Sequence, residues 1–141
     1  MISINHTSFT VLDVEKTAKF YQGLGLTLID LSPRDSGFAE KVTGAKGAKL
    51  KIAYLSAGNG LLELVEYARG KGKEAHTRPN DTGSAHLCFD AEDFDATLRK
   101  IRQLGGKLLS PPMKVPAGPN KGKRMCYARD CEGNLLEFFG R

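Results

Sequence analysis

The chain of 141 residues contains no tryptophan, and no apolar run approaches the roughly 20 residues that span a bilayer. It has only three cysteines, and none are in Cys-x-x-Cys spacing, so the sequence predicts neither a disulfide framework nor a zinc knuckle. The N-terminus lacks the basic head and apolar stretch of a secretory signal. We therefore expect a cytoplasmic protein that does not enter a membrane.

The net charge of +5 arises mainly from lysine and arginine in loop-like stretches. No basic-aromatic interleaving or helix-turn-helix pattern accompanies them, so we expect no nucleic-acid partner. Basic loops of this kind are solvated surface or attract an anionic small molecule. Arg34 and Arg124, which lie in or near loops, are the candidate contacts for a substrate carboxylate or phosphate. The basic stretches are Lys41–Lys51, Arg69–Arg78 and Lys114–Arg124.

An internal repeat organises the chain. The segment Gly83–Gly106 repeats the N-terminal pattern, with His86 at the position of His6. Each half then ends in a Leu-Leu-Glu segment, which contains Glu63 in the first half and Glu137 in the second. Two histidines and two glutamates at repeat-equivalent positions are four possible metal ligands. The other matched pairs are Phe9 and Phe89, Asp13 and Asp93, and Thr17 and Thr97.

Alternation and capping signals predict a strand, a helix and three further strands in the first half. Asp13 is the expected N-cap of the helix. The stretch Ser32–Gly47 is irregular, with room for a single helical turn, and its length is typical of a lid or binding loop. The predicted elements are a strand Ile2–Val11, a helix from Val14, and strands Leu26–Leu31, Ala48–Ala57 and Leu61–Tyr67.

The second half repeats this order after a polar linker, residues 68–82, in which we expect His76 to be solvated. Residues 1–141 thus form one predicted α+β domain of two βαβββ modules, 1–67 and 83–141. Cys88 shares the face of His86, and we expect it to be a small buried hydrophobic side chain. The predicted elements are strands Ala85–Phe89, Lys107–Ser110, Arg124–Arg129 and Leu135–Phe139, a helix Phe94–Leu104 and a loop Pro111–Gly122.

Three segments resemble the signature segments of the vicinal oxygen chelate superfamily, which includes glyoxalase I, methylmalonyl-CoA epimerase, extradiol dioxygenases and bleomycin resistance proteins. They are HTSFTVLDVEKTAKFYQGLGL, AHLCFDAEDFDATLRKIRQLG and RDCEGNLLEFF. The resemblance covers essentially the whole chain apart from the loops. It implies that the two modules form a cup-shaped mixed sheet with the helices outside and a metal ion at the centre.

The matching ligand positions are His6, Glu63, His86 and Glu137. This set resembles that of glyoxalase I, which implies a lyase or isomerase that binds nickel, cobalt, zinc or manganese. Its substrate would be an α-oxo or α-hydroxy compound, with a glutathione hemithioacetal as one candidate, converted through a metal-bound enediolate. Glu137 and Glu63 are the candidate catalytic carboxylates, since a carboxylate that leaves the metal can act as the base.

Three alternatives remain open. An extradiol-type dioxygenase would use iron with two histidines and one glutamate. An epimerase of the methylmalonyl-CoA type usually has glutamine in place of Glu63 and a carboxylate on the preceding strand, where this chain has Lys49 and Lys51. A metal-free binding or resistance protein would need an aromatic groove, for which four tyrosines and no tryptophan give little support.

Assembly is also implied by the resemblance. Family members of this size form homodimers, in which the two modules of one chain often contribute to different metal sites. The linker permits pairing within one chain or between chains, and we expect a homodimer with the metal at the interface between modules.

Overall fold

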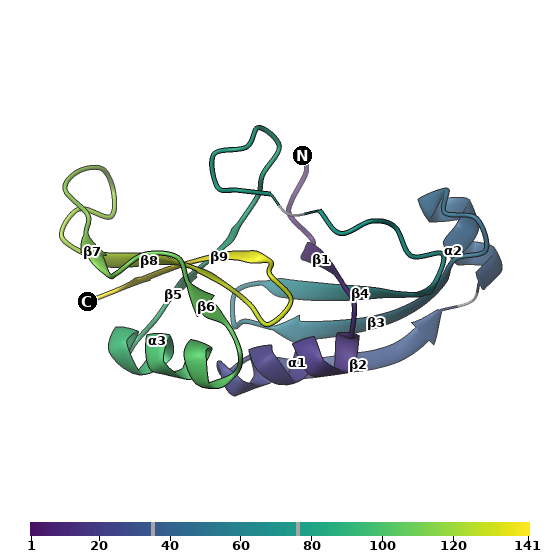
Figure 1. The fold of residues 1–141 in the computed structure, drawn as a ribbon, viewed down its shortest axis with the longest axis horizontal. Helices are drawn as coiled ribbons and strands as arrows, with labels where there is room; N and C mark the ends of the chain where they lie inside the picture. Colours follow the sequence, from purple (N-terminus) through teal and green to yellow (C-terminus); the bar gives the residue numbers. More distant parts are fainter. Residues whose placement is uncertain (35, 76) are drawn as a thin grey trace. The chain divides into compact units, whose positions relative to one another are not determined.

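The computed structural model describes residues 1–34, 36–75 and 77–141, and the chain divides into two compact units, Met1–Ala75 and His76–Arg141 (Figure 1). His76, which we expected to be solvated, lies outside the described residues. Each unit contains a mixed sheet with the predicted strand-helix-strand order. The predicted α+β fold of two βαβββ modules is therefore confirmed.

The sheet of the first unit has the strand order β1-β4-β3-β2. Strand β1 runs parallel to β4, and the other neighbours are antiparallel. Helix α1 connects β1 to β2, which lie at opposite edges of this sheet, and α2 connects the antiparallel neighbours β2 and β3. The elements are β1 (Thr7–Val11), α1 (Val14–Gly23), β2 (Thr27–Arg34), α2 (Ser36–Thr43), β3 (Lys49–Ser56) and β4 (Leu61–Arg69).

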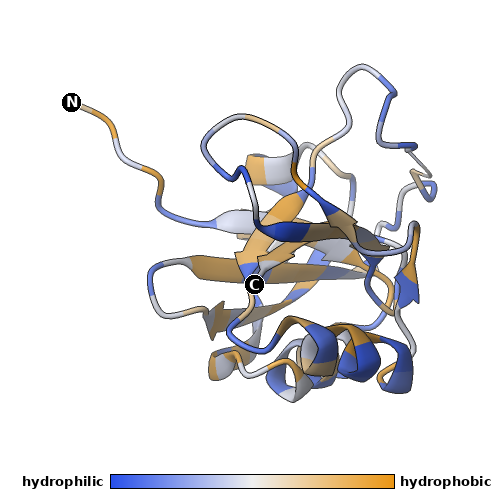
Figure 2. Ribbon diagram, turned by 90° about the vertical axis from the view of Figure 1, so that its left-hand side faces the viewer, coloured by the Kyte–Doolittle hydropathy of each residue, from blue (hydrophilic) through white to orange (hydrophobic). Residues whose placement is uncertain are grey.

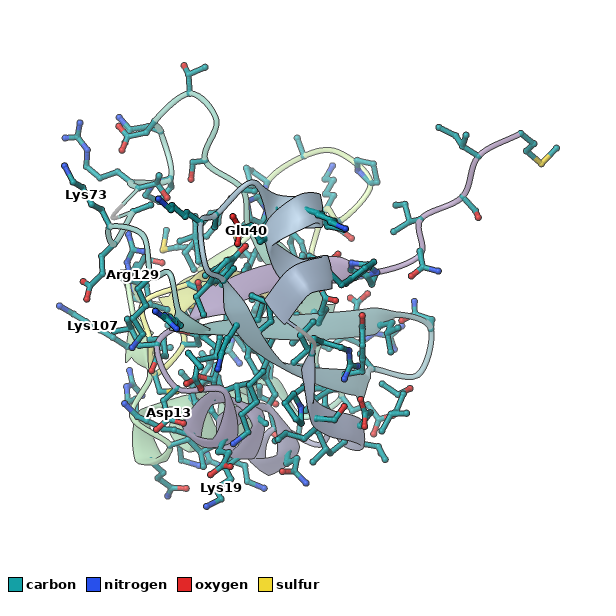
Figure 3. The ribbon with its side chains drawn as sticks, turned by 90° about the vertical axis from the view of Figure 1, so that its right-hand side faces the viewer. Asp13, Lys19, Glu40, Lys73, Lys107 and Arg129 are labelled. Atoms are coloured by element: carbon teal, nitrogen blue, oxygen red, sulfur yellow. The ribbon has the colours of Figure 1, made fainter. Side chains whose placement is uncertain are left out.

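Helix α1 begins at a double cap. The Asp13 carboxylate accepts a hydrogen bond from the Lys16 amide at 2.9 Å, and Glu66 on β4 accepts one from the Val14 amide at 3.0 Å. The apolar side of α1 packs on β3 and β4, while Lys19 points away from the sheet (Figure 3). The fully buried residues on this side include Val14, Ala18, Tyr21, Ala53, Leu55, Leu62 and Leu64.

Helix α2 covers the opposite face of the same sheet, as Glu40 on α2 and Asp13 beside α1 show in Figure 3. Ala39 is fully buried against Ala48, Leu50 and Ile52. The prediction of an irregular stretch at Ser32–Gly47 is therefore wrong in part, because an eight-residue helix forms here rather than a single turn. Packing of Ala39 on the sheet stabilises a helix relative to an irregular loop, because it removes apolar surface from water.

The second unit has the order β5-β9-β8-β6, with β7 also paired to β8. The short strand β7 lies in the predicted loop Pro111–Gly122, where pairing with the neighbouring strand overrides the proline-rich sequence. Helix α3 packs on β6 and β9. The elements are β5 (Leu87–Asp90), α3 (Phe94–Gln103), β6 (Lys107–Leu108), β7 (Met113–Lys114), β8 (Arg124–Arg129) and β9 (Leu135–Gly140).

The first strand of each unit begins later than predicted. Strand β1 starts at Thr7 rather than Ile2, and β5 starts at Leu87 rather than Ala85, so each candidate histidine is the residue just before its strand. Pairing of β1 begins at Thr7 opposite Leu62, and the exposed N-terminal residues extend away from the sheet (Figure 2). Sequence alternation alone does not reveal where the partner strand ends.

None of the helices in the described part of the chain combines the length and the apolar character needed to cross a bilayer.

The start of α3 depends on a glycine in β9. A Cβ atom added at Gly140 would lie 2.6 Å from the Cβ atom of Phe94, whose side chain is buried. Arg124, opposite Gly140 on β8, places its guanidinium 4.9 Å from the centre of the Phe94 ring. Glycine is therefore required here for close packing rather than for its backbone angles.

We expect Gly140→Ala to reduce the free energy of unfolding by about 1–3 kcal/mol, because the new methyl group overpacks the contact with Phe94. Urea unfolding followed by circular dichroism measures the change. Gly72→Ala is the matched control, since an added Cβ atom there meets nothing within 4 Å. Equal unfolding midpoints for the two variants would contradict this account of Gly140.

Candidate metal-binding and catalytic site

The register of the first sheet places four side chains on one face. Glu63 on β4 is opposite Ser8 on β1 and opposite Tyr54 on β3. His6 precedes Ser8 by two residues, so it lies on the same side of the strand. We call the face of each sheet that carries the glutamate its site face.

His6, Tyr54 and Glu63 form what we call the first half-site. The His6 Nε2 atom lies 3.4 Å from Glu63 Oε2, and the Tyr54 hydroxyl donates a hydrogen bond of 2.5 Å to Glu63 Oε1. The Glu63 side chain is only 12% exposed, whereas that of His6 is 34% exposed. The hydrogen bond to Glu63, together with desolvation, raises the pKa of Tyr54, so the phenol stays protonated and remains a donor.

The second unit repeats this arrangement. Glu137 on β9 is opposite Cys88 on β5 and opposite Tyr127 on β8. The His86 Nε2 atom lies 3.0 Å from Glu137 Oε2, and the Glu137 side chain is 12% exposed. The rings of His86 and Tyr127 are perpendicular, with centres 5.3 Å apart. His86 and Glu137 form the second half-site, and the Tyr127 ring lies beside it.

Each half-site thus brings together one histidine and one glutamate that the sequence predicts as metal ligands. Within residues 1–34, 36–75 and 77–141, no group of three or more His, Cys, Asp or Glu side chains is arranged to hold an ion. Each unit therefore supplies two of the four predicted donors by itself.

Sequence reasoning missed Tyr54 and Tyr127. Tyr54 alternates with Leu50 and Ile52 in the manner of a core residue, and no local pattern distinguishes Tyr127. The repeat carries the signal for both, because each tyrosine lies on the strand before the Leu-Leu-Glu segment, directly opposite the glutamate. The turn between the strands is one residue longer in the second unit, so a fixed sequence offset does not align the two tyrosines.

Arg34 lies on the site face of the first sheet. A β-bulge at Ile29 brings Asp30 opposite Tyr54, and the Arg34 guanidinium pairs with Asp30 at 3.0 Å. Hydrogen bonds from Ser32 and then Arg34 hold the pKa of Asp30 below its ordinary value. Arg34 also donates to the Ser32 hydroxyl, so its guanidinium is held in place beside the half-site.

Arg124, the other predicted substrate contact, lies on the opposite face of its sheet. Met125 and Tyr127 point to the site face, so Arg124, which is adjacent to Met125 on β8, points to the other face. Its guanidinium makes two hydrogen bonds to Asp95, of 2.8 and 2.9 Å. These bonds raise the pKa of Arg124 and lower that of Asp95. The structure thus brings Arg124 to the start of α3 and not to Glu137.

A different cation, Lys123, is close to the second half-site. Its ammonium group is 2.9 Å from Asp90 and lies over the Phe139 ring, and Asp90 and Phe139 are opposite one another on the site face. No sequence pattern separates Lys123 from its basic neighbours, because its contacts depend on the pairing of β5 with β9.

Cys88 corrects our expectation of a buried hydrophobic residue, because its side chain is exposed on the site face. Partial desolvation and then the charge of Glu137 raise the pKa of Cys88 to about 12. The residue at the equivalent place in the first unit is Ser8, opposite Glu63. A thiol with this pKa is protonated at neutral pH and is a poor nucleophile.

Comparison with known proteins shows the family of the chain. Residues 3–138 match the family model of the Glyoxalase/Bleomycin resistance protein/Dioxygenase superfamily. The chain therefore belongs to this superfamily. A human relative, the mitochondrial methylmalonyl-CoA epimerase, is 23% identical over 137 residues, which are 95% of this chain and 71% of that protein.

Solved structures of three relatives share the fold. A glyoxalase family protein from Bacillus cereus has a TM-score of 0.88 at 22% identity, covering 99% of this chain and 94% of that one. A glyoxalase I mutant from Zea mays has a TM-score of 0.68 at 23% identity, covering 97% and 44%. A Listeria monocytogenes fosfomycin resistance protein, complexed with Mn(II), has a TM-score of 0.66 at 21% identity, covering 99% and 93%.

We expect iodoacetamide to modify Cys88 in the native, metal-free protein at least about 100-fold more slowly than in the urea-unfolded chain, because the raised pKa leaves little thiolate. Glu137→Gln removes the negative charge, lowers the pKa of Cys88 and should raise the native rate. Peptide mapping by mass spectrometry at constant pH measures both rates. Glu63→Gln is the control, and an equal acceleration by both variants would show that the Glu137 charge is not the cause.

Proposed function

We propose that the protein is a divalent-metal-dependent lyase or isomerase of the glyoxalase I type, with His6, Glu63, His86 and Glu137 as the metal ligands. The observation that carries the proposal is the repetition of one histidine-glutamate pair at the same place in both sheets. A single pair of this kind is common in proteins. Its recurrence on two sheets, each time with a largely buried glutamate, favours a shared ligand over two unrelated salt bridges.

The donors fit a divalent ion. Two ligand atoms bound at about 2.1 Å and roughly at right angles are about 3 Å apart, and the histidine-glutamate distances are 3.4 and 3.0 Å. Two imidazoles and two carboxylates suit nickel, cobalt, zinc or manganese, and the carboxylates balance the charge of the ion. The manganese complex of the Listeria relative supports the same class of ion.

A divalent ion in such a site stabilises negative charge on a substrate oxygen when a proton leaves the neighbouring carbon. In this chain, Glu137 or Glu63 would accept that proton and return it to the next carbon, which isomerises an α-oxo or α-hydroxy substrate. Arg34 would contact an anionic group of the substrate, because it lies on the site face of the first sheet. A glutathione hemithioacetal has the required carbonyl chemistry and carboxylates for such a contact.

Epimerisation of an α-carbon acid is the second candidate, and the human epimerase relative favours it. Such a reaction needs acid-base groups on both sides of one carbon. The site face of β3 carries Leu50, Ile52 and Tyr54 but no carboxylate, and Asp30 on β2 is paired with Arg34. The glyoxalase-type isomerisation therefore ranks first.

We expect the protein, stripped with chelator and reloaded with nickel, cobalt, zinc or manganese, to bind one ion per chain and to isomerise the hemithioacetal of methylglyoxal and glutathione. His86→Ala and Glu137→Ala should each weaken binding of the ion by at least about 100-fold, since each removes a ligand. Elemental analysis and calorimetric titration give the stoichiometry and the affinity. Glu92→Ala, at an exposed position near α3, is the control.

Absence of metal binding in the unmodified protein would overturn the enzyme proposal and turn the search to apolar or anionic ligands held without metal. Metal binding without hemithioacetal turnover would retain the site and reject this substrate, and the epimerase assay would follow.

We also propose a homodimer in which one half-site of each kind, from different protomers, binds each ion. We expect dilution that dissociates the dimer to weaken metal affinity, because it separates the two pairs of ligands. Sedimentation and metal titration over the same range of protein concentration test this. Constant affinity through the transition to monomer would instead assign all four ligands to one chain.

A further inference from the structure

The two half-sites share one plan but differ in the contacts of the carboxylate. In the first, Glu63 uses both oxygens: Oε1 accepts the Tyr54 hydroxyl at 2.5 Å, and Oε2 faces His6 at 3.4 Å. In the second, Oε2 of Glu137 faces His86 at 3.0 Å. Among the described residues, no hydrogen bond joins Tyr127 to Glu137.

The difference does not come from the backbone, because each tyrosine is directly opposite its glutamate in the strand register. The difference comes from the position of the tyrosine side chain in each unit. The Tyr127 ring packs close to His86, with centres 5.3 Å apart, whereas the Tyr54 and His6 rings are 6.2 Å apart. Tyr54 therefore contacts the carboxylate by its hydroxyl, and Tyr127 contacts the imidazole by its ring.

A hydrogen bond to one oxygen of a carboxylate restricts rotation of the whole group. For Glu63 the bond from Tyr54 leaves Oε2 directed toward His6, the arrangement that two ligands of one ion need. Partners of this kind, which do not touch the metal, typically change metal affinity by about 10–100-fold when they are removed. Half-burial of the phenol makes the bond stronger, since less water competes for it.

We infer that Tyr54 is a positioning residue, which fixes Glu63 as a ligand of the ion, and that Tyr127 has no equivalent role toward Glu137. The inference rests on the proposed metal site. The two halves of the site are then unequal: the Tyr54 hydroxyl orients the carboxylate of Glu63, whereas among the described residues the Tyr127 hydroxyl makes no such bond to Glu137.

The chain supplies its own matched pair of variants, Tyr54→Phe and Tyr127→Phe. Each removes one hydroxyl and keeps the aromatic ring. We expect Tyr54→Phe to weaken cobalt binding by about tenfold or more and to alter the visible absorption of the bound cobalt, because the Glu63 carboxylate is no longer oriented. Tyr127→Phe should leave the affinity within about twofold of the unmodified protein and leave the spectrum unchanged.

Thermal unfolding of the metal-free proteins separates a local effect from a loss of fold, and the spectrum reports the ligands directly. Equal affinities and spectra for both variants and the unmodified protein, with binding still abolished by His86→Ala, would overturn the role of Tyr54 while the proposed function stands. Equal weakening by both variants would also overturn it, since the hydrogen bond is made in one half only. Absence of cobalt binding by the unmodified protein would overturn the proposed function together with this inference.

Discussion

A carboxylate on the largely apolar surface of a sheet needs a polar partner, and this requirement governs the site of each unit. The side chains of Glu63 and Glu137 are each only 12% exposed. A charge in such surroundings is costly unless hydrogen bonds or an opposite charge compensate it. In both units a histidine just before the parallel strand lies against the carboxylate, and in the first unit a tyrosine on the antiparallel strand also donates a hydrogen bond to it. The sheet therefore determines which residues can meet the glutamate.

The two helices of the first unit pack on opposite faces of its sheet. Helix α1 packs on one face, and Glu63 and Tyr54 lie on the other. Helix α2 covers only part of that second face, where Ala39 packs on Leu50 and Ile52, and Tyr54 lies at the edge of this contact. The half-site is thus bordered by apolar packing on one side and by the Asp30–Arg34 pair on β2. A ligand at this place would meet apolar, anionic and cationic groups over a short span of sheet.

The histidines and glutamates could be predicted because the repeat marks their positions without any knowledge of the fold. The tyrosines could not be found in this way, since a tyrosine that alternates with leucine and isoleucine has the pattern of a core residue. Only the pairing register shows that Tyr54 faces a carboxylate. Arg124 does not lie near Glu137, because adjacent residues of a strand point to opposite faces and Arg124 is an odd number of residues from Tyr127. Helix α2 depends on its packing against β3, and the late start of β1 depends on its pairing with β4, and neither contact is visible in the local sequence.

The parallel pairing of the first strand of each unit also orders the steps by which a half-site can assemble. Tyr54 and Glu63 are nine residues apart and meet as soon as one hairpin closes. His86 and Glu137 are 51 residues apart and meet only when an edge strand docks beside the last strand of its sheet. Closing the longer loop costs more chain entropy, so it follows the local contacts. We therefore expect the imidazole to be the last member of each half-site to arrive, and the second half-site to form only after β9 has paired with β5.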